Sequence, residues 1–242
     1  MSYSTQGRRY ICVSGGKGGV GKSSFAAGLA RALHASGSRV GLVDADLAGP
    51  SQSCLFELAR MRASRGRLVP PSADGVRVAS MGLLANEATA LVWSKDAIEG
   101  ALASFILDAD WGDANVFVVD LPPGHDVVHR TVLDMAPGAR SLFVTTGSRL
   151  AIVDCRRDIA FSRRMGVKPI GIVENFSHIS CPDCGTQHPM HAGSAVDELA
   201  KETAMPIVCR LPFDADVASG LRMSTLSQTC QMAWSKTGGD DV

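Results

Sequence analysis

The sequence predicts an α/β fold in which a mostly parallel central sheet carries helices on both faces. Short apolar runs alternate with segments of helical period along most of the 242 residues, and a glycine-rich turn follows the first run directly. Hydrophobic residues make up 45% of the chain and aromatic residues only 5%, which suits Val, Ile, Leu and Ala packed between sheet and helices. An open α/β sheet can use this length as one unit, so we expect a single domain over residues 1–242.

Seven runs are predicted to be buried strands because each is short, apolar and bounded by polar or turn residues. They are Tyr10–Ser14, Arg39–Asp44, Val76–Ala79, Val116–Asp120, Ser141–Thr145, Ile170–Glu174 and Ile207–Arg210. Between the first two, Phe25, Leu29 and Leu33 recur every four residues and Gly37 offers a C-terminal cap, which predicts a helix. Helices between strands favour a parallel sheet, with ligands at the carboxyl ends of its strands.

Three segments are expected to lack regular structure: residues 1–9, Arg60–Ser72 and the tail 235–242. The middle one holds the longest basic cluster, formed by Arg60, Arg62, Arg65 and Arg67, which we interpret as a solvated loop. Lys plus Arg equals Asp plus Glu at 24 each, so the chain has no net field to draw it onto nucleic acid or an anionic membrane. We therefore expect neither as a partner.

The first apolar run and the placement of the cysteines together predict a protein of a reducing compartment. The first apolar run is too short for a signal peptide or a membrane span, which predicts a cytoplasmic protein, where disulfides are uncommon. Most of the seven cysteines lie in apolar or helical patterns typical of buried thiols. Only Cys181 and Cys184 lie among Pro, Asp and Gly, in a loop with the sequence HISCPDCGTQHPMH.

A phosphate-binding loop is predicted where the first strand meets the first helix. Gly16, four further residues and then Gly21-Lys22-Ser23 fit the pattern G-x-x-x-x-G-K-[ST]. In such a loop, backbone N–H groups and a helix N-terminus bind phosphates, the lysine reaches the β- and γ-phosphates and the hydroxyl ligates Mg²⁺. The nucleotide-binding residues predicted here are Gly16, Lys17, Gly18, Gly19, Val20, Gly21, Lys22, Ser23 and Ser24.

Acidic residues end two of the predicted strands in the order that nucleotide hydrolysis requires. Asp44 and Asp46 lie in GLVDAD, on the same side of the chain because strand side chains alternate. Asp120 ends the apolar run VFVVD, the form of a Walker B aspartate that holds the Mg²⁺ shell. Each aspartate alone could be a turn former, but their occurrence together after a phosphate-binding loop predicts a functional role.

The loop GKGGVGKSS carries an early lysine, Lys17, that the general pattern does not require. With this spelling the chain resembles the deviant Walker A (SIMIBI) ATPases, which include the nitrogenase iron protein and the septum- and plasmid-positioning ATPases MinD and ParA. The resemblance implies a homodimer in which Lys17 reaches the partner's nucleotide, as an arginine finger does in trans. It also implies catalytic roles for Lys22 and for Asp46, which would orient the attacking water, and a switch II that opens at Asp120.

A narrower resemblance covers nearly the whole chain. The stretches VGLVDADLAGPS, VDLPPG, VTTGSRLAIVDCRR and GIVENFSHISCPDCG look like the Mrp (ApbC, Nbp-type) iron–sulfur cluster carrier ATPases. This resemblance implies that Asn175 and Pro212 contact the adenine base. The chain departs from the family after Pro122-Pro123-Gly124, where His125 and Asp126 stand in place of the usual Thr and Gly, so we expect slow hydrolysis. Ser94-Lys95-Asp96 replaces the usual Arg-Gly-Pro after Trp93.

Cys181 and Cys184 supply two ligands, whereas a tetrahedral metal or cluster site takes four. In a two-fold dimer the same pair from both subunits would supply four thiolates for a [4Fe–4S] cluster, which is the family arrangement. Within one chain, His188 and His191 would complete a Cys₂His₂ zinc site instead. A redox-active dithiol and two free thiols are the remaining alternatives.

Two functions follow from these patterns. The first is an ATP-dependent carrier that holds an iron–sulfur cluster at a dimer interface and passes it to apo-proteins. The second is a positioning or regulatory ATPase with a Cys/His zinc loop. The second function requires a basic amphipathic C-terminal helix, and the segment Val217–Trp234 has one Arg and little contrast between its faces. The sequence therefore favours the carrier.

Overall fold

The computed structural model describes residues 7–84 and 93–214 of the chain. Its centre is a sheet of eight strands in the order β12-β9-β8-β1-β7-β2-β6-β5. These strands are β1 (Arg9–Ser14), β2 (Val40–Asp44), β5 (Ser72–Ala73), β6 (Val76–Ala79), β7 (Val116–Asp120), β8 (Arg140–Thr145), β9 (Lys168–Glu174) and β12 (Ile207–Arg210). All neighbouring strands pair in parallel except β5, which runs antiparallel to β6.

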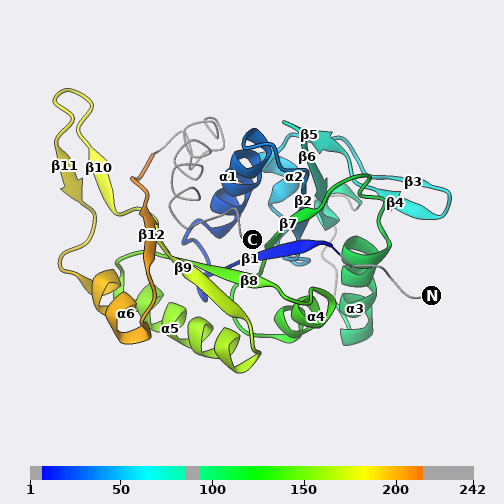
Figure 1. The fold of residues 1–242 in the computed structure, drawn as a ribbon. Coiled ribbons are helices and arrows are strands. Elements are labelled where there is room, and N and C mark those ends of the chain that lie inside the picture. Colours follow the sequence, from blue (N-terminus) through cyan, green and yellow to red (C-terminus); the bar gives the residue numbers. More distant parts are fainter. Residues whose placement is uncertain (1–6, 85–92, 215–242) are drawn as a thin grey trace.

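Helices cover both faces of this sheet (Figure 1). On one face lie α1 (Lys22–Ala35) and the short α2 (Gln52–Leu55). On the other lie α3 (Lys95–Ala103), α4 (Val127–Met135), α5 (Arg149–Arg164) and α6 (Ala195–Thr203). A 3₁₀ turn spans Met81–Leu83, and a π-helical turn, Ser104–Asp108, follows α3. The predicted α/β class with a mostly parallel sheet is confirmed.

The observed strands match the predicted ones closely. Val76–Ala79, Val116–Asp120 and Ile207–Arg210 have identical bounds, and the other four differ by one or two residues at their amino ends. The predicted first helix ends at Ala35, and Gly37 just beyond it has a φ of 91°, as expected for a helix-terminating glycine. The tail 235–242, residues 1–6 and the segment Val217–Trp234 lie outside the described residues.

Two hairpins project from opposite ends of the sheet (Figure 1). One pairs β10 (His178–Ser180) with β11 (Gln187–Pro189), and the other pairs β3 (Arg62–Ser64) with β4 (Arg67–Val69). The second hairpin corrects the prediction that Arg60–Ser72 lacks regular structure. Its two-residue turn has a φ of 49° at Arg65 and 77° at Gly66, the conformation that joins tightly paired strands.

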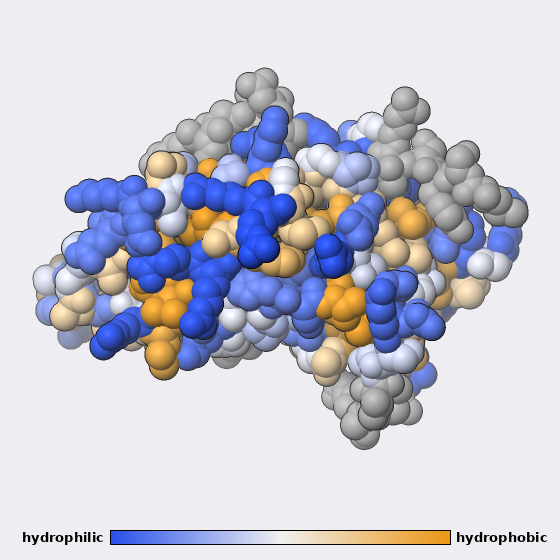
Figure 2. Space-filling model, turned by 90° about the horizontal axis from the view of Figure 1, so that it is seen from below, coloured by the Kyte–Doolittle hydropathy of each residue, from blue (hydrophilic) through white to orange (hydrophobic). Residues whose placement is uncertain are grey.

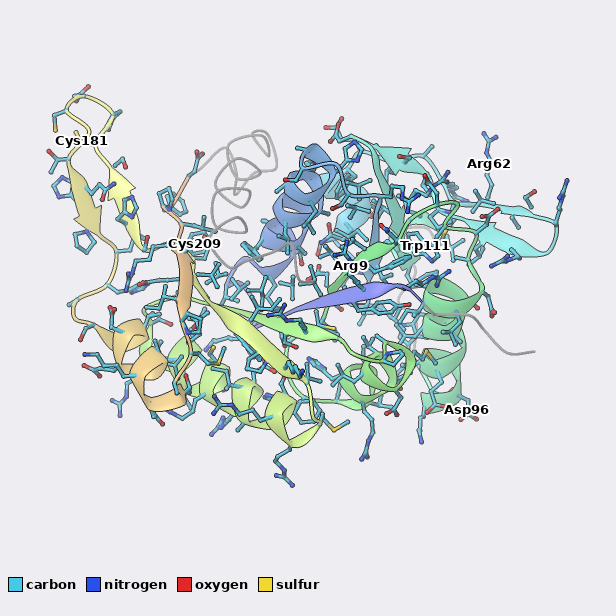
Figure 3. All side chains as sticks on the ribbon, in the orientation of Figure 1. Arg9, Arg62, Asp96, Trp111, Cys181 and Cys209 are labelled. Atoms are coloured by element: carbon cyan, nitrogen blue, oxygen red, sulfur yellow. The ribbon has the colours of Figure 1, made fainter. Side chains whose placement is uncertain are left out.

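The basic cluster of this segment is only partly the solvated loop we predicted. Arg62 projects from the β3–β4 hairpin toward solvent (Figure 3). Arg67 instead donates hydrogen bonds from its guanidinium to the backbone oxygens of Asp108 at 2.6 Å and Ala109 at 3.2 Å. At the amino-terminal segment, Arg8 Nη1 similarly donates to Ile106 O at 2.7 Å, and Arg9 opens β1.

The core consists of strand side chains packed against the helices. The strands β1, β2 and β7 are buried along almost their whole length because helices cover both faces of the sheet. Phe117 on β7 is fully buried, with the Tyr10 ring stacked on it at 5.3 Å and the Trp111 ring edge-on at 5.1 Å. These aromatic pairs pack β1 and the segment before β7 against Phe117 of β7.

The face that carries α4 and α5 is mostly hydrophilic, with separate apolar patches between charged side chains (Figure 2). Among the helices in the described part of the chain, none is long and apolar enough to cross a bilayer.

Phe117→Ala should lower the free energy of unfolding by about 3–5 kcal/mol, because it leaves a cavity between two other rings. Chemical denaturation monitored by Trp fluorescence would measure the loss. Leu150→Ala is the control: this side chain is 64% exposed, so its loss should change the stability by no more than about 0.5 kcal/mol. Equal effects of the two substitutions would contradict the packing described here.

Candidate nucleotide site and cysteine hairpin

The predicted phosphate-binding loop joins β1 to α1 at the carboxyl end of the central strand. Gly21 has a φ of 88°, a conformation that side chains rarely adopt, and a Cβ on it would lie 2.1 Å from Asn175 Nδ2. A Cβ on Gly16 would lie 2.6 Å from the backbone oxygen of Asp154 on α5. Glycine is therefore required at both positions, where the loop is pressed against β9 and α5.

Lys22 lies at the first position of α1, nearly buried, and folds back over the loop. Its Nζ donates to the backbone oxygen of Lys17 at 3.0 Å. Burial lowers the pKa of Lys22, while the negative charges of Asp120, Asp46 and Asp158 oppose this shift. The nearly buried ammonium thus lies within the field of three carboxylates, and phosphate oxygens could replace the loop carbonyl as its partner.

Asp44 anchors the segment after β2. Its carboxylate is fully buried and accepts from Ser80 Oγ at 2.9 Å and from the backbone N–H groups of Ser51 and Gln52 at 3.0 Å each. Burial, together with the charge of nearby Asp120, raises the pKa of Asp44 to about 8 despite these donors. Asp44 therefore fixes the backbone that carries Asp46.

Asp46 lies two residues beyond, half-buried at the same edge of the sheet. Its Oδ1 accepts from the backbone N–H of Gly49 at 2.9 Å. Because this carboxylate is accessible and close enough to Lys22 to influence its pKa, it lies where a water attacking a terminal phosphate could be oriented.

Asp120 ends β7 beside the loop and is buried. Gln52 Nε2 donates to its Oδ2 at 2.8 Å and to the backbone oxygen of Ser23 at 3.0 Å. Its other oxygen, Oδ1, has no hydrogen-bond partner among the described residues. Burial raises the pKa of Asp120 to about 6, against the opposing effects of Gln52, Ser23 and Lys22. A buried, unpartnered carboxylate oxygen next to a serine suits the hard oxygen ligation that Mg²⁺ prefers.

Gln52, Ser80 and Asp158 were not identified from the sequence. All three are fully buried and each hydrogen-bonds to a residue of the site or of the loop. Asp158 on α5 accepts from Ser14 Oγ at 2.7 Å and from the backbone N–H of Gly16 at 3.0 Å. Their complete burial identifies these three polar side chains as part of the site, and burial of a single side chain is visible only in the tertiary structure.

Asn175, predicted to contact an adenine base, is instead bound to the phosphate-binding loop in the described chain. Its Nδ2 donates to Val20 O at 3.0 Å, and its side chain is almost fully buried. Pro212 lies half-buried between Leu211, whose N–H donates to Glu174 O, and the exposed Phe213. The rings of Phe213 and Phe176 meet edge-on at 5.6 Å, which forms an aromatic rim beside the loop.

Cys181 and Cys184 lie in the turn of the β10–β11 hairpin. The backbone N–H of Cys181 donates to Thr186 O, and that of Gly185 donates to Cys181 O, at 2.9 Å each. This turn leaves Cys184 exposed and Cys181 half-buried, near the outer end of the hairpin (Figure 3). Hydrogen bonding to the Thr186 hydroxyl lowers the pKa of the Cys184 thiol, which favours the thiolate form that binds metals.

The two histidines of this segment do not join the cysteines. His188 lies opposite Ile179 in the hairpin ladder, and His191 lies against Gly147 at the start of the loop before α5. Within the described ranges, no group of three or more His, Cys, Asp or Glu side chains is placed to hold a metal ion. A four-ligand site at the cysteines thus needs ligands from outside these residues of one chain.

The comparison with known proteins agrees with this geometry. Residues 6–235 match the family described as "ParA: NUBPL iron-transfer P-loop NTPase". The chain belongs to this family. It is 35% identical over 214 residues to the iron–sulfur cluster carrier protein of Pseudomonas fragi, of which it covers 75%. It is 31% identical over 221 residues to that of Escherichia coli K12, of which it spans only 60%. The resemblance to Mrp-type carriers is confirmed.

Solved structures place the fold among nucleotide-binding relatives. The nucleotide-binding protein of Archaeoglobus fulgidus, in complex with ADP, is 29% identical to this member of the NUBPL family, with a TM-score of 0.74 over 93% of this chain and 87% of that one. The septum site-determining protein MinD of Pyrococcus horikoshii, complexed with Mg-ADP, is 15% identical, with a TM-score of 0.67 over 93% and 94% of the two chains. The second likeness shows the shared fold.

Asp120→Asn should stabilise the protein without nucleotide or Mg²⁺ near pH 8, by on the order of 1–3 kcal/mol. The pKa of Asp120 rises from 3.8 in the reference state to about 6 in the fold. Its ionisation therefore destabilises the fold progressively as the pH rises from about 4 to 6 and fully above that range. Thermal unfolding at pH 4 and pH 8 measures the difference between the variant and the unmodified protein.

The gain should shrink toward pH 4, where the carboxyl group is protonated in the fold and already partly protonated in the reference state. Asp46→Asn is the matched control, because it removes a half-buried carboxylate from the same edge of the sheet and should change the midpoint much less. A lower midpoint for Asp120→Asn at both pH values would show that the hydrogen bond from Gln52 outweighs the buried charge.

Proposed function

We propose that this chain is an ATP-hydrolysing carrier that holds a [4Fe–4S] cluster between two copies and transfers it to apo iron–sulfur proteins. The observation that carries the proposal is the exposed turn bearing Cys181 and Cys184, with no third ligand beside them in the described part of the chain. Two such turns related by a two-fold axis supply four thiolates, the ligand set of this cluster. The cluster is the cargo of the protein.

The nucleotide site is proposed to bind Mg·ATP through the loop Gly16–Ser24. Lys22 would exchange its contact with the Lys17 carbonyl for the β- and γ-phosphates. Ser23 and Asp120 would hold Mg²⁺, which supplies charge neutralisation at the phosphates when bound. Asn175 would keep the loop in register through Val20 and turn its amide toward the base, beside Pro212.

Hydrolysis is proposed to need both subunits. Asp46 would orient the attacking water, and Lys17 would cross the interface to the partner's phosphates. ATP would favour a closed dimer, and hydrolysis an open one. The dimer would therefore hold the cluster in its closed state and release it in its open state.

The alternative is a positioning or regulatory ATPase like MinD or ParA. The structural likeness to MinD, at 15% identity, shows the fold and carries no function. That alternative gives no role to the exposed cysteine pair, so the carrier accounts for more of the molecule.

Lys22→Ala should weaken Mg·ATP binding by roughly 100-fold or more, because the phosphates lose a charge-assisted partner. Lys17→Ala should bind Mg·ATP normally but hydrolyse it on the order of 10³-fold more slowly if it acts in trans. Titration with a fluorescent ATP analogue and steady-state hydrolysis separate the two effects. Lys168→Ala, an exposed lysine at the start of β9, is the control; equal losses of affinity at Lys17 and Lys22 would refute the trans role.

Cys181→Ser and Cys184→Ser should each abolish cluster binding, because a serine oxygen is a harder and poorer ligand for iron than a thiolate. Anaerobic reconstitution with iron and sulfide, followed by an absorption spectrum and an iron count, measures this. The unmodified protein should hold about four irons per dimer and sediment as a dimer. Both variants should still bind ATP, and Cys54→Ser, which removes an exposed thiol on α2, should keep the cluster.

His188→Ala and His191→Ala should leave the cluster intact. If each monomer instead bound one zinc ion and lost it in the histidine variants, the bridged site would be wrong and the hairpin would be a zinc loop.

A further inference from the structure

Asp158 on α5 has no role in the function proposed above, yet its two carboxylate oxygens contact two segments of the nucleotide site. The side chain is fully buried. Its Oδ2 accepts from Ser14 Oγ and from the backbone N–H of Gly16, so it fixes the first turn of the phosphate-binding loop. A charged acceptor on a backbone N–H is among the stronger hydrogen bonds in proteins.

The second oxygen of Asp158 faces switch II. Its Oδ1 lies 3.3 Å from Nε2 of His125, which is ion-pair distance, and it accepts no hydrogen bond from any described group. His125 lies five residues after Asp120, in the segment that the family resemblance implies is switch II. The carboxylate thus lies between the phosphate-binding loop and His125, and it contacts both.

His125 is the more accessible partner of this contact. Its side chain is 25% exposed, whereas the Asp158 side chain is 1% exposed. The preceding Gly124 has a φ of 98°, and no atom lies within 4 Å of the position that a Cβ would take there. Of the two partners, His125 is therefore the one with room to leave the contact.

The surroundings of His125 decide its charge. On α5, the negative charges of Asp158 and Asp154 raise the pKa of His125, and the positive charge of Arg157 lowers it. The Phe161 ring of the same helix packs edge-on against His125 at 5.4 Å.

On α4, the ring of His129 lies 6.2 Å from that of His125. Burial lowers the pKa of His129, which favours its neutral form. Asp126, just before α4, faces other partners. Its Oδ1 accepts a hydrogen bond from the Val128 N–H and lies 3.2 Å from His129 Nδ1.

The Asp158 carboxylate 3.3 Å away raises the pKa of His125 above its ordinary value of 6.5. The ion pair is fully formed below that ordinary value and is lost as the pH rises through the raised value. The contact therefore weakens as the pH rises above the ordinary range of histidine titration.

We propose that Asp158 is a positioning residue that couples the phosphate-binding loop to switch II through His125, and that loss of the His125 proton releases switch II for ATP hydrolysis. The inference rests on the proposed ATPase activity for its kinetic consequence. Its structural part, the ion pair and its link to the loop, is independent of hydrolysis.

The ion pair is tested by NMR titration of the histidine rings in the nucleotide-free protein, with the His125 signal assigned by its loss in His125→Gln. The midpoint of His125 should lie above 6.5 in the unmodified protein and fall in Asp158→Asn, which removes the charge. In Ser14→Ala it should rise, because the carboxylate then loses a competing donor. If Asp158→Asn does not fold, the midpoint of His125 in Ser14→Ala still tests the ion pair. An unchanged midpoint in the folded variants would overturn the proposal.

The coupling is tested by separating affinity from turnover. Asp158→Asn should weaken binding of a fluorescent ADP roughly tenfold, whereas His125→Gln should alter it by less than about twofold. The ATPase rate of the unmodified protein should rise roughly three- to tenfold as His125 loses its proton, and His125→Gln should lack this step. His34→Gln, an exposed histidine at the end of α1, is the control and should keep it.

A pH step that survives in His125→Gln would overturn the release by deprotonation. If ATP is not hydrolysed at all, the proposed function fails, while the NMR midpoints and the ADP affinities still decide whether Asp158 links the loop to switch II.

Discussion

The nucleotide site depends on one electrostatic arrangement, in which a single lysine is nearly buried among aspartates. Lys22 lies within the field of Asp46, Asp120 and Asp158, which come from three different elements. Without a ligand these charges are imperfectly balanced: burial lowers the pKa of Lys22 and raises that of Asp120. Phosphates would satisfy the lysine and a divalent cation would satisfy the carboxylate, so the fold is built for a ligand that carries both charges.

The sheet makes this arrangement possible. Parallel pairing of β1 with β7 and of β7 with β2 brings Ser14, Asp120 and Asp44 to the same edge. This much follows from the sequence, because a run of apolar residues ending in Asp marks a strand end, and parallel strands end together. The residues that complete the edge could not be predicted in this way. Gln52 and Ser80 are ordinary polar residues until the fold brings them against Asp120 and Asp44.

Local sequence patterns also failed to predict the burial of single side chains and one hairpin, because the same residues suit several conformations. Asp154 and Asp158 share a face of α5 by their spacing of four, yet the first is partly exposed and the second is fully buried behind the loop. The β3–β4 hairpin was missed because its turn has Arg65 at the position where asparagine, aspartate or glycine is usual, so Gly66 alone carried the turn signal. The cysteine turn was found because the ligand types themselves mark it.

The two halves of the proposed function are connected through β9. This strand ends at Glu174, Asn175 follows it and contacts the phosphate-binding loop, and the hairpin begins three residues later at His178. On the return, Met190 N–H donates to Ser177 O, and His191 packs against Gly147. A shift of the loop on binding phosphate would therefore act on the start of the hairpin through Asn175. Such short, packed connections transmit displacement because close-packed interiors yield little, so the spacing of two facing cysteine pairs would follow the state of the nucleotide.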